Sequence, residues 1–318
     1  MFNLENIQLS VVIPVHNEMD NIPPLTKRLL EVLQEFSFQL IYVDDGSTDA
    51  TNQNIRAIQN SKIILVELSK RFGQSIALAK GIEVAQGKYI VTMDGDMQND
   101  PKDIPKLLEL IQTKQWDLIT GIRMRRKDNI LRTIPSLVAN AIVRFSFGLR
   151  VKDLGCGLKI FTAELAKSLP FYGEQHRYIT LIAHLQGARI FEIPVSHHRR
   201  LSGMSKYNLN RTLRVVGDLI IILLQNKNLK LLLSALCSIG GLLIAFGFTV
   251  GLYLVFLSPM NGKGWDMQWF WIGTLNAFFG LHLFGLGLLY KFREKSYKES
   301  IQGKVMHVKT VTTLYVGS

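Results

Sequence analysis

Two long runs without Asp, Glu, Lys or Arg constrain the fold of this 318-residue chain most strongly. The first run extends over residues 231–258 and the second over residues 267–290. A helix that crosses a bilayer needs about 20 apolar residues, so both runs are long enough. We therefore predict a hairpin of two transmembrane helices, 229–258 and 267–290, joined by a short loop, 259–266. The alternative, a pair of buried helices in a soluble domain, is disfavoured because buried helices seldom reach this length without a charge.

The charges around these runs predict how the hairpin is oriented. Lysines or arginines precede the first run and follow the second, whereas the loop holds only Lys263, offset by Asp266. By the positive-inside rule, both ends of the hairpin are cytoplasmic and the loop is not. We read no signal peptide after Met1. These features predict a multi-pass protein of the inner (plasma) membrane, with a cytoplasmic domain over 1–206 and a cytoplasmic tail over 291–318.

Two further features bear on the membrane. Arg211 and Arg214 precede an apolar stretch, 219–224, which favours an amphipathic helix over 207–228 that lies at the bilayer surface. The alternative is that this helix is simply the last helix of the domain. Glycines in both long runs, such as Gly240 and Gly280, predict close helix packing and leave a homo-oligomer open.

The net charge also limits the partners. Lys plus Arg outnumber Asp plus Glu by 37 to 25, which gives a net charge of +12. Such a balance suits either nucleic acid or an anionic membrane surface. Nucleic-acid binding would place aromatic residues among the basic ones, but Phe145 and Phe147 lie in an apolar stretch instead. We therefore expect the lipid bilayer as a partner and no nucleic acid.

The first 200 residues alternate between predicted strands and helices. Short apolar runs predict strands at 10–14, 40–43, 63–68, 89–93 and 118–121. Helical spacing predicts helices at 21–36, 48–59 and 74–85, and a fourth that begins at Pro101. This order predicts an α/β fold whose mostly parallel sheet is covered on both faces and binds ligands at the carboxyl ends of its strands. The chain has neither a G-x-G-x-x-G turn after its first strand nor a P-loop.

Carboxylates follow three of the predicted strands. Glu18 follows the first, Asp44 and Asp45 the second, and Asp94 and Asp96 the fourth. Two carboxylates two positions apart can face one cation, and oxygen ligands of this kind suit Mg²⁺ or Mn²⁺. The side chain of Gln98 could serve as a third, neutral ligand of the same cation, beside Asp94 and Asp96. Each cluster alone could be a simple turn, but their recurrence at successive strand ends predicts a site for a divalent metal and a nucleotide diphosphate, with one carboxylate on a ribose hydroxyl or base.

Several motifs together resemble a known family. They are V-V-I-P-V-H-N-E at 11–18, D-D-G-S-T-D at 44–49, F-G-Q at 72–74, D-G-D-M-Q-N-D-P at 94–101, G-x-R-x-x-R-x-D at 121–128, D-x-G-C-G-L-K at 153–159 and E-I-P-V-x-H-x-x-R-x-x-G-x-S-K-Y at 192–207. In this order they resemble family 2 glycosyltransferases of the GT-A fold, and within them the enzymes that use polyprenyl phosphates. The resemblance covers residues 3–290. His16 and Gly95 depart from the residues common in the family, Tyr and Ala.

The resemblance implies roles for particular residues. The donor nucleotide sugar would bind at Pro14, His16, Glu18, Asp44, Asp45, Ser47 and Asp94. The phosphate of the acceptor lipid would bind at Arg123, Arg132, Ser136 and Ser205. Catalysis would involve Asp96, Asp153, Arg200 and Lys206.

The activity implied is an inverting transfer of a sugar from a nucleotide diphosphate, expected to be UDP, to a polyprenyl (undecaprenyl) phosphate. A phosphate monoester has a second pKa of about 6, so the nucleophile is already mostly dianionic at neutral pH and needs no strong base. We therefore expect Asp153 to orient groups rather than abstract a proton. Two alternatives remain: a polysaccharide synthase of the same superfamily, although Q-x-x-R-W is absent, and a non-catalytic membrane subunit that binds nucleotide sugars.

Overall fold

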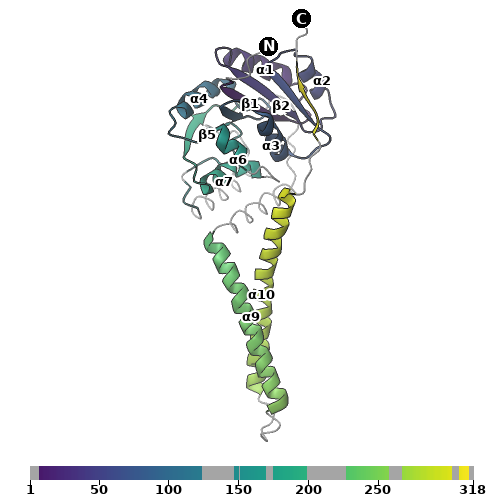
Figure 1. Cartoon of the computed structure of the whole chain (residues 1–318), viewed down its shortest axis with the longest axis vertical. Coiled ribbons are helices and arrows are strands. Elements are labelled where there is room, and N and C mark those ends of the chain that lie inside the picture. Colours follow the sequence, from purple (N-terminus) through teal and green to yellow (C-terminus); the bar gives the residue numbers. More distant parts are fainter. Residues whose placement is uncertain are drawn as a thin grey trace. The chain divides into compact units, whose positions relative to one another are not determined.

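The computed structural model describes residues 7–123, 147–149, 151–169, 175–198, 227–257, 267–302 and 308–314. The chain divides into two compact units (Figure 1). The first unit consists of Met1–Leu219 and Met306–Ser318, and the second of Ile220–Val305. Most of the amphipathic helix predicted over 207–228, and the loop predicted over 259–266, lie outside the described residues.

The first unit is built around a sheet with helices between its strands. From the amino terminus its elements are β1 (Leu9–Val15), α1 (Ile22–Val32), β2 (Phe38–Asp44), α2 (Thr51–Arg56), β3 (Ile63–Leu68), α3 (Gln74–Val84), β4 (Tyr89–Thr92), η2 (Pro101–Asp103), α4 (Ile104–Gln112) and β5 (Leu118–Arg123). They continue with β6 (Lys159–Thr162), α6 (Ala163–Ser168), η3 (Gln175–Arg177), α7 (Ile179–Leu185), β7 (Ile190–Val195) and, after the second unit, β8 (Val308–Thr313). The five strands and four helices predicted for this part of the sequence are confirmed, with shifts of a few residues at their ends.

The sheet has the order β7-β5-β6-β4-β1-β2-β3-β8. Its centre is parallel: β1 pairs with β2 and β4, and β2 pairs with β3. β6 runs antiparallel to both β4 and β5, and β8 runs antiparallel to β3 at the edge. The predicted α/β class with a mostly parallel sheet is therefore confirmed. β8 was not predicted, because the region after residue 291 was treated as a tail.

Helices cover both faces of the central strands, as the continuous apolar sequence of these strands requires. Successive side chains of β1 point to opposite faces. Val11 and Ile13 belong to the apolar cluster that residues of α1 and α4 complete, whereas Val12 contacts α3 at Gly81. α3 packs very closely here, since a Cβ on Gly81 would lie 2.3 Å from Val12 Cγ1 and 2.9 Å from Val43 Cγ2. This packing holds α3 against β1 and β2, the strands whose carboxyl ends carry the candidate site described below.

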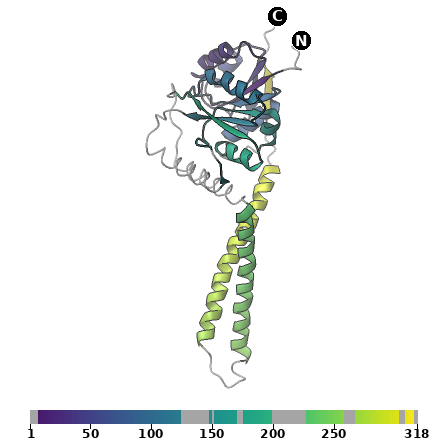
Figure 2. The same cartoon turned by 90° about the vertical axis from the view of Figure 1, so that its left-hand side faces the viewer.

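The second unit consists of α9 (Lys227–Leu252), the π-helical turn η4 (Tyr253–Leu257) and α10 (Met267–Gln302). Figure 2 shows the two helices side by side. Two segments of 23 residues are long and apolar enough to cross a membrane: Ser234–Phe256, which runs from α9 into η4, and Met267–Leu289 of α10. Only 17% of either segment is buried, whereas a core helix of a soluble protein would be mostly buried. α10 also continues past residue 290, where its Lys and Glu residues are good helix formers.

Glycines bring the backbones of α9 and α10 together, as the sequence predicts. A Cβ on Gly240 would lie 2.5 Å from Phe284 N and 2.7 Å from the Gly280 carbonyl oxygen. A Cβ on Gly247 would lie 2.6 Å from the carbonyl oxygen of Gly273. Small residues of this kind let membrane helices gain van der Waals contact without a hydrophobic driving force.

We predict that Gly240→Ala destabilises the helix pair by about 1–3 kcal/mol, because its methyl group would meet backbone atoms that cannot move aside. Gly241→Ala is the matched control, since nothing lies within 4 Å of its Cβ position. Thermal unfolding of the full chain in one detergent should show a lower midpoint for Gly240→Ala alone. Equal midpoints for the two variants would contradict the packing described here.

Candidate active site

Three loops meet at one edge of the sheet, because parallel strands end on the same side. The pairings Val15 with Asp44 and Val12 with Thr92 align the carboxyl ends of β1, β2 and β4. The loops that follow begin at His16, Asp45 and Met93. This is the edge at which open α/β sheets bind ligands.

The loop after β1 is tied to the loop after β2. The Asn17 backbone N–H donates to Ser47 Oγ at 3.0 Å, and the Thr48 N–H donates to Asn17 Oδ1 at 2.8 Å. The His16 ring nitrogen Nδ1 lies 2.9 Å from the Asp45 carbonyl oxygen. Asn17 has a φ of 55°, a left-handed conformation that Asn tolerates better than most residues. The predicted donor-site residues His16 and Ser47 thus lie on two interlocked loops.

Two predicted donor-site carboxylates also shape these loops. Asp44 is buried, and its Oδ1 accepts from the Ser47 N–H at 2.9 Å while its Oδ2 accepts from Asn52 Nδ2 at 3.2 Å. Glu18 is half-buried, and its Oε2 accepts from Asn21 Nδ2 at 2.7 Å. Pro14, which precedes them, is a half-buried residue of β1. The structure therefore brings Pro14, Glu18 and Asp44 to the same edge.

Asp45 supports a further loop, the one between β3 and α3. Its carboxylate accepts from the Phe72 N–H at 2.6 Å and from the Gly73 N–H at 2.9 Å. Burial raises the pKa of Asp45, although these two hydrogen bonds and the nearby His16 and Arg71 oppose the rise. Both oxygens thus hold the turn that precedes α3, where Gly73 has a φ of 101°. The F-G-Q motif is this turn.

Asp94 is held from two sides. Gln74 Nε2, at the start of α3, donates to Asp94 Oδ1 at 2.7 Å. On the other side, a Cβ added to Gly157 would lie only 2.1 Å from Asp94 Oδ2. Gly157 is therefore the residue that lets the loop 153–158 lie against this carboxylate. Neither Gln74 nor Gly157 was singled out from the sequence, although both stand inside motifs that the sequence analysis quoted.

The turn that carries Asp96 is fixed by the chain after β7. Asp96 Oδ1 accepts from the Gln98 N–H at 3.2 Å, and Met97 between them has a φ of 63°. The Gln98 carbonyl accepts from the His198 N–H at 2.8 Å, and His198 Nε2 lies 3.1 Å from Asp100 Oδ2. His198, the last described residue after β7, therefore lies beside this turn. The predicted site residues Arg200, Ser205 and Lys206 lie outside the described residues.

Arg123, which is half-buried, forms an ion pair with the buried Asp153. Arg123 Nε and Nη2 donate to the two carboxylate oxygens of Asp153 at 2.8 and 2.9 Å. Burial disfavours the charged guanidinium, but the hydrogen bonds and charge of Asp153 outweigh it and raise the pKa of Arg123. The Asp153 N–H in turn donates to Glu192 Oε1 at 2.7 Å. Two residues that the sequence assigned to separate roles are thus one unit, while the other predicted acceptor residues, Arg132 and Ser136, lie outside the described residues.

Lys159 stabilises the loop between Asp153 and Gly157. The side chain is buried, and its Nζ donates to the Cys156 carbonyl. Burial lowers the pKa of Lys159, whereas the nearby Cys156, Asp153 and Asp94 oppose this shift. Lys159 therefore places a buried amine behind the loop that touches both Arg123 and Asp94. Its position in the D-x-G-C-G-L-K motif was the only sequence signal for it.

The donor set at Asp94 and Asp96 fits a divalent cation bound together with a diphosphate. In the described part of the chain, no group of three or more His, Cys, Asp or Glu side chains could hold a metal by itself. Mg²⁺ commonly uses only one or two protein carboxylates and completes its shell with phosphate oxygens and water. Asp94 and Asp96 supply two, and Gln98 lies on the same turn.

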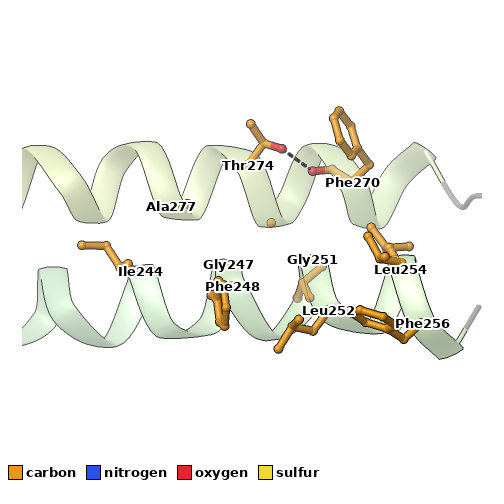
Figure 3. Close-up of a pocket in the computed structure, with 13 residues that line it drawn as sticks. Ile244, Gly247, Phe248, Gly251, Leu252, Leu254, Phe256, Phe270, Thr274 and Ala277 are labelled. Atoms are coloured by element: carbon orange, nitrogen blue, oxygen red, sulfur yellow. Dashed lines mark hydrogen bonds between the residues drawn. The ribbon is translucent and has the colours of Figure 1, made fainter.

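The pocket between α9 and α10 has a different chemistry. It has a volume of about 530 Å³, and Thr274 contributes the one side-chain polar atom of its lining. That hydroxyl donates to the Phe270 carbonyl at 2.8 Å (Figure 3). This pocket offers no titratable group, whereas the strand-end edge offers several carboxylates, so the edge is the candidate active site.

Comparison with known proteins identifies the class. Residues 10–168 match the family described as glycosyl transferase family 2. This half of the chain contains β1 to β6 and all the donor-site residues described above. The chain belongs to this family and is a glycosyltransferase.

Named relatives extend the match. The dodecaprenyl-phosphate galacturonate synthase of Rhizobium johnstonii is 41% identical over 68% of this chain and 67% of its own length. The undecaprenyl-phosphate 4-deoxy-4-formamido-L-arabinose transferase of Aeromonas hydrophila is 30% identical over 94% of this chain and 92% of its own length. Its alignment therefore reaches far beyond the sheet into the two apolar helices. The predicted resemblance to glycosyltransferases that use polyprenyl phosphates is confirmed.

Solved structures share the fold. Glucosyl-3-phosphoglycerate synthase from Mycobacterium tuberculosis, with Mn²⁺ and UDP-glucose bound, has a TM-score of 0.55 and 22% identity. The match covers 68% of this chain and 78% of that one. The predicted GT-A fold of the catalytic domain is therefore confirmed.

We predict that Gly157→Ala lowers the rate of sugar transfer about 10- to 100-fold, because its methyl group displaces the Asp94 carboxylate and small misplacements in a site have effects of this size. Gly187→Ala is the control for a glycine substitution, because nothing lies within 4 Å of its Cβ position. Its φ of 86° makes this change the more strained of the two in the backbone, so backbone strain alone would affect the control more. Initial rates and melting curves of both variants should show the loss of rate only in Gly157→Ala. An unchanged rate in Gly157→Ala would contradict the contact with Asp94.

Proposed function

We propose that this chain transfers a sugar from a UDP-linked donor to a polyprenyl phosphate at the cytoplasmic face of the cell membrane, with inversion at the anomeric carbon. One structural observation carries the proposal. The loop 153–157 touches both halves of the site, because Asp153 pairs with Arg123 and Gly157 lies against Asp94. The carboxylates suited to the donor and the arginine suited to an acceptor phosphate are thus joined by one short loop.

The acceptor class comes from the relatives. Both relatives described above are named for a polyprenyl phosphate, one dodecaprenyl and the other undecaprenyl. An apolar helix pair long enough to cross a membrane would anchor the chain in the bilayer that holds such a lipid. The amphipathic helix predicted over 207–228 would then keep the site near the phosphate head group.

Arg123 would bind the phosphate of the acceptor. A guanidinium has five N–H donors, and Asp153 uses two of them. The other three can face a phosphate while Asp153 keeps the group oriented. Arg132, Ser136 and Ser205 are proposed to complete this phosphate site.

The reaction would be a single displacement. A phosphate oxygen of the acceptor attacks the anomeric carbon, and the bond from that carbon to the nucleotide diphosphate breaks. The attacking phosphate is already mostly dianionic at neutral pH, so no residue needs to remove a proton. Asp153 therefore serves to orient Arg123, and Arg200 and Lys206 are proposed to stabilise the departing diphosphate.

The donor would lie along the loops after β1, β2 and β4. Asp44, Ser47 and His16 are proposed to contact the nucleoside. Glu18 would support the loop after β1, and Asp45 the turn before α3. Asp94, Asp96 and Gln98 would hold Mg²⁺ or Mn²⁺, which when bound neutralises charge on the diphosphate. The resulting substrate pair is a nucleotide sugar and a lipid phosphate.

A panel of labelled UDP- and GDP-sugars tests the proposal. The donors should include galacturonic acid and 4-deoxy-4-formamido-arabinose, because relatives are named for these sugars. Each is incubated with the full chain, undecaprenyl or dodecaprenyl phosphate, and Mg²⁺, Mn²⁺ or EDTA. We expect label in the lipid phase from one UDP-sugar, and its loss with EDTA. If no donor labels the lipid although the folded protein binds UDP, the proposal fails for the sugars and the acceptors of this panel.

We predict that Asp96→Asn reduces transfer at least about 100-fold, because a neutral amide binds a hard cation poorly and pre-organised charge in a site is worth this much. The fold should be retained, since Asn can still accept the Gln98 N–H. Transfer assays and melting curves check both points. Full activity in a folded Asp96→Asn protein would refute the assignment of the metal.

We predict that Asp153→Asn raises the KM for polyprenyl phosphate about tenfold, because Arg123 loses its charged partner and its fixed orientation. The affinity for UDP should change little. Initial rates at varied acceptor, together with calorimetric titration of UDP, separate the two effects. Weaker UDP binding with an unchanged acceptor KM would place Arg123 and Asp153 on the donor side instead.

A further inference from the structure

The carboxyl-terminal strand reaches a side chain that is linked to the donor site. β8 pairs with β3 so that Thr310 lies opposite Glu67, next to an irregularity between Glu67 and Leu68. The Thr310 hydroxyl donates to Glu67 Oε2. The strand that follows the apolar helix pair in sequence thus contacts a carboxylate on the sheet.

The Glu67 carboxylate connects three elements, since Glu67 belongs to β3 and contacts side chains of β8 and α2. Besides Thr310 of β8, it accepts from Arg56 Nη2 at the end of α2 and from Asn52 Nδ2 at 2.6 Å. Only 12% of its side chain is exposed. Burial opposes ionisation, but the hydrogen bonds from Thr310, Asn52 and Arg56 outweigh it and lower the pKa of Glu67. The carboxylate is therefore charged and held in one orientation.

Asn52 continues the chain of contacts. Its amide nitrogen donates to Glu67 Oε1 at 2.6 Å and to Asp44 Oδ2 at 3.2 Å. Its amide oxygen accepts from Arg56 Nε at 2.8 Å. This oxygen contact fixes which end of the amide is the donor, because an arginine cannot accept a hydrogen bond. Both N–H groups of Asn52 are therefore committed to the two carboxylates.

Asp44 is the last member and belongs to the donor site. Its other oxygen holds the Ser47 N–H at 2.9 Å, so Asn52 and Ser47 together determine how the carboxylate is turned. Asp44 is almost fully buried and cannot reorient toward bulk solvent. A shift of Asn52 therefore weakens or redirects one of the two hydrogen bonds that orient Asp44.

We propose that Thr310, Glu67 and Asn52 are positioning residues for Asp44, so that β8 adjusts the binding of the donor nucleotide. This inference rests on the proposed function, in which Asp44 contacts the nucleoside. Loss of β8 would leave Glu67 without one of its donors and loosen Asn52. Donor binding would then depend on a strand that is remote in sequence and separated from the rest of the domain by the apolar helices.

A purely structural role for these contacts predicts something else. Glu67 would simply attach α2 and β8 to β3, and its loss would lower stability without a preference for either substrate. The positioning role predicts a change for the donor and none for the acceptor. The two substrates of one enzyme therefore provide the discriminating measurement.

Thr310→Val tests the chain of contacts in the full-length enzyme. Valine keeps the β-branched shape and removes the hydroxyl, and Thr312→Val makes the same change elsewhere on β8. We expect the donor KM and the Kd for UDP to rise about three- to tenfold in Thr310→Val. This is less than the full effect of one lost hydrogen bond to a charged group, because the loss reaches Asp44 only through Glu67 and Asn52. The acceptor KM should stay constant, Thr312→Val should match the wild type, and Thr310→Ser should restore donor binding.

Several results would overturn the inference. Equal donor constants in Thr310→Val and Thr312→Val would do so, and so would a lower melting temperature without any change in UDP binding. If Thr310→Val fails to fold, Asn52→Leu removes the middle link and should weaken UDP binding at least as much. A wild-type enzyme that neither binds UDP nor uses a nucleotide donor would refute the proposed function itself, whereas a normal wild type with unaffected variants refutes only this inference.

Discussion

The two hydrogen bonds that Asp45 accepts from Phe72 and Gly73 hold the site together. They fix the turn before α3 at the end of β2, although burial makes a charged carboxylate costly there. Because this turn is fixed, the next residue, Gln74, can reach Asp94 at the end of β4. Asp45 therefore helps to set the position of Asp94. The predicted metal ligand Asp94 thus depends on a residue, Asp45, that is not itself a predicted metal ligand.

Other side chains along this edge of the sheet are also positioned by their neighbours. Asp94 meets the loop 153–157 through Gly157, and that loop holds Arg123 through Asp153. Two contacts support the loop itself: Lys159 donates to the Cys156 carbonyl, and Glu192 of β7 accepts from the Asp153 N–H. Preorganisation of this kind is what lets a site stabilise charge on a leaving group without reorganising during the reaction. In the proposed reaction the acceptor phosphate is already charged, so the protein needs to supply little acid–base chemistry, and most of the residues described here would serve to position others.

Much of this architecture could be predicted from the sequence. The run at 63–68 is apolar and rich in isoleucine, and the strand has these limits in the structure. Asp94 and Asp96 could be predicted because their two-residue spacing is local. Gln74 could not, because its contact with Asp94 depends on where α3 starts relative to β4. Arg123 and Asp153 were both identified, but their pairing depends on the loop between β5 and β6, which no spacing rule describes.

The carboxyl-terminal strand illustrates a different limit. Residues 308–313 are rich in valine and threonine, which favours a strand. Two long apolar helices separate them from the rest of the sheet, so nothing local indicates that they pair with β3. Glu67 likewise looks like an ordinary polar residue in an apolar run until Thr310, Asn52 and Arg56 are brought around it. Contacts of this kind are decided by the tertiary structure, and they are where the sequence predicts least.

The central claim is that the edge with Asp94 and Asp96 binds a nucleotide diphosphate together with a divalent cation. Electron paramagnetic resonance of Mn²⁺ tests it directly, because bound Mn²⁺ loses the sharp six-line signal of the free ion. The account predicts that the full chain takes up Mn²⁺ when UDP is present, and that Asp96→Asn, folded to the same extent, does not. Equal uptake by the two proteins, or uptake that ignores UDP, would contradict it.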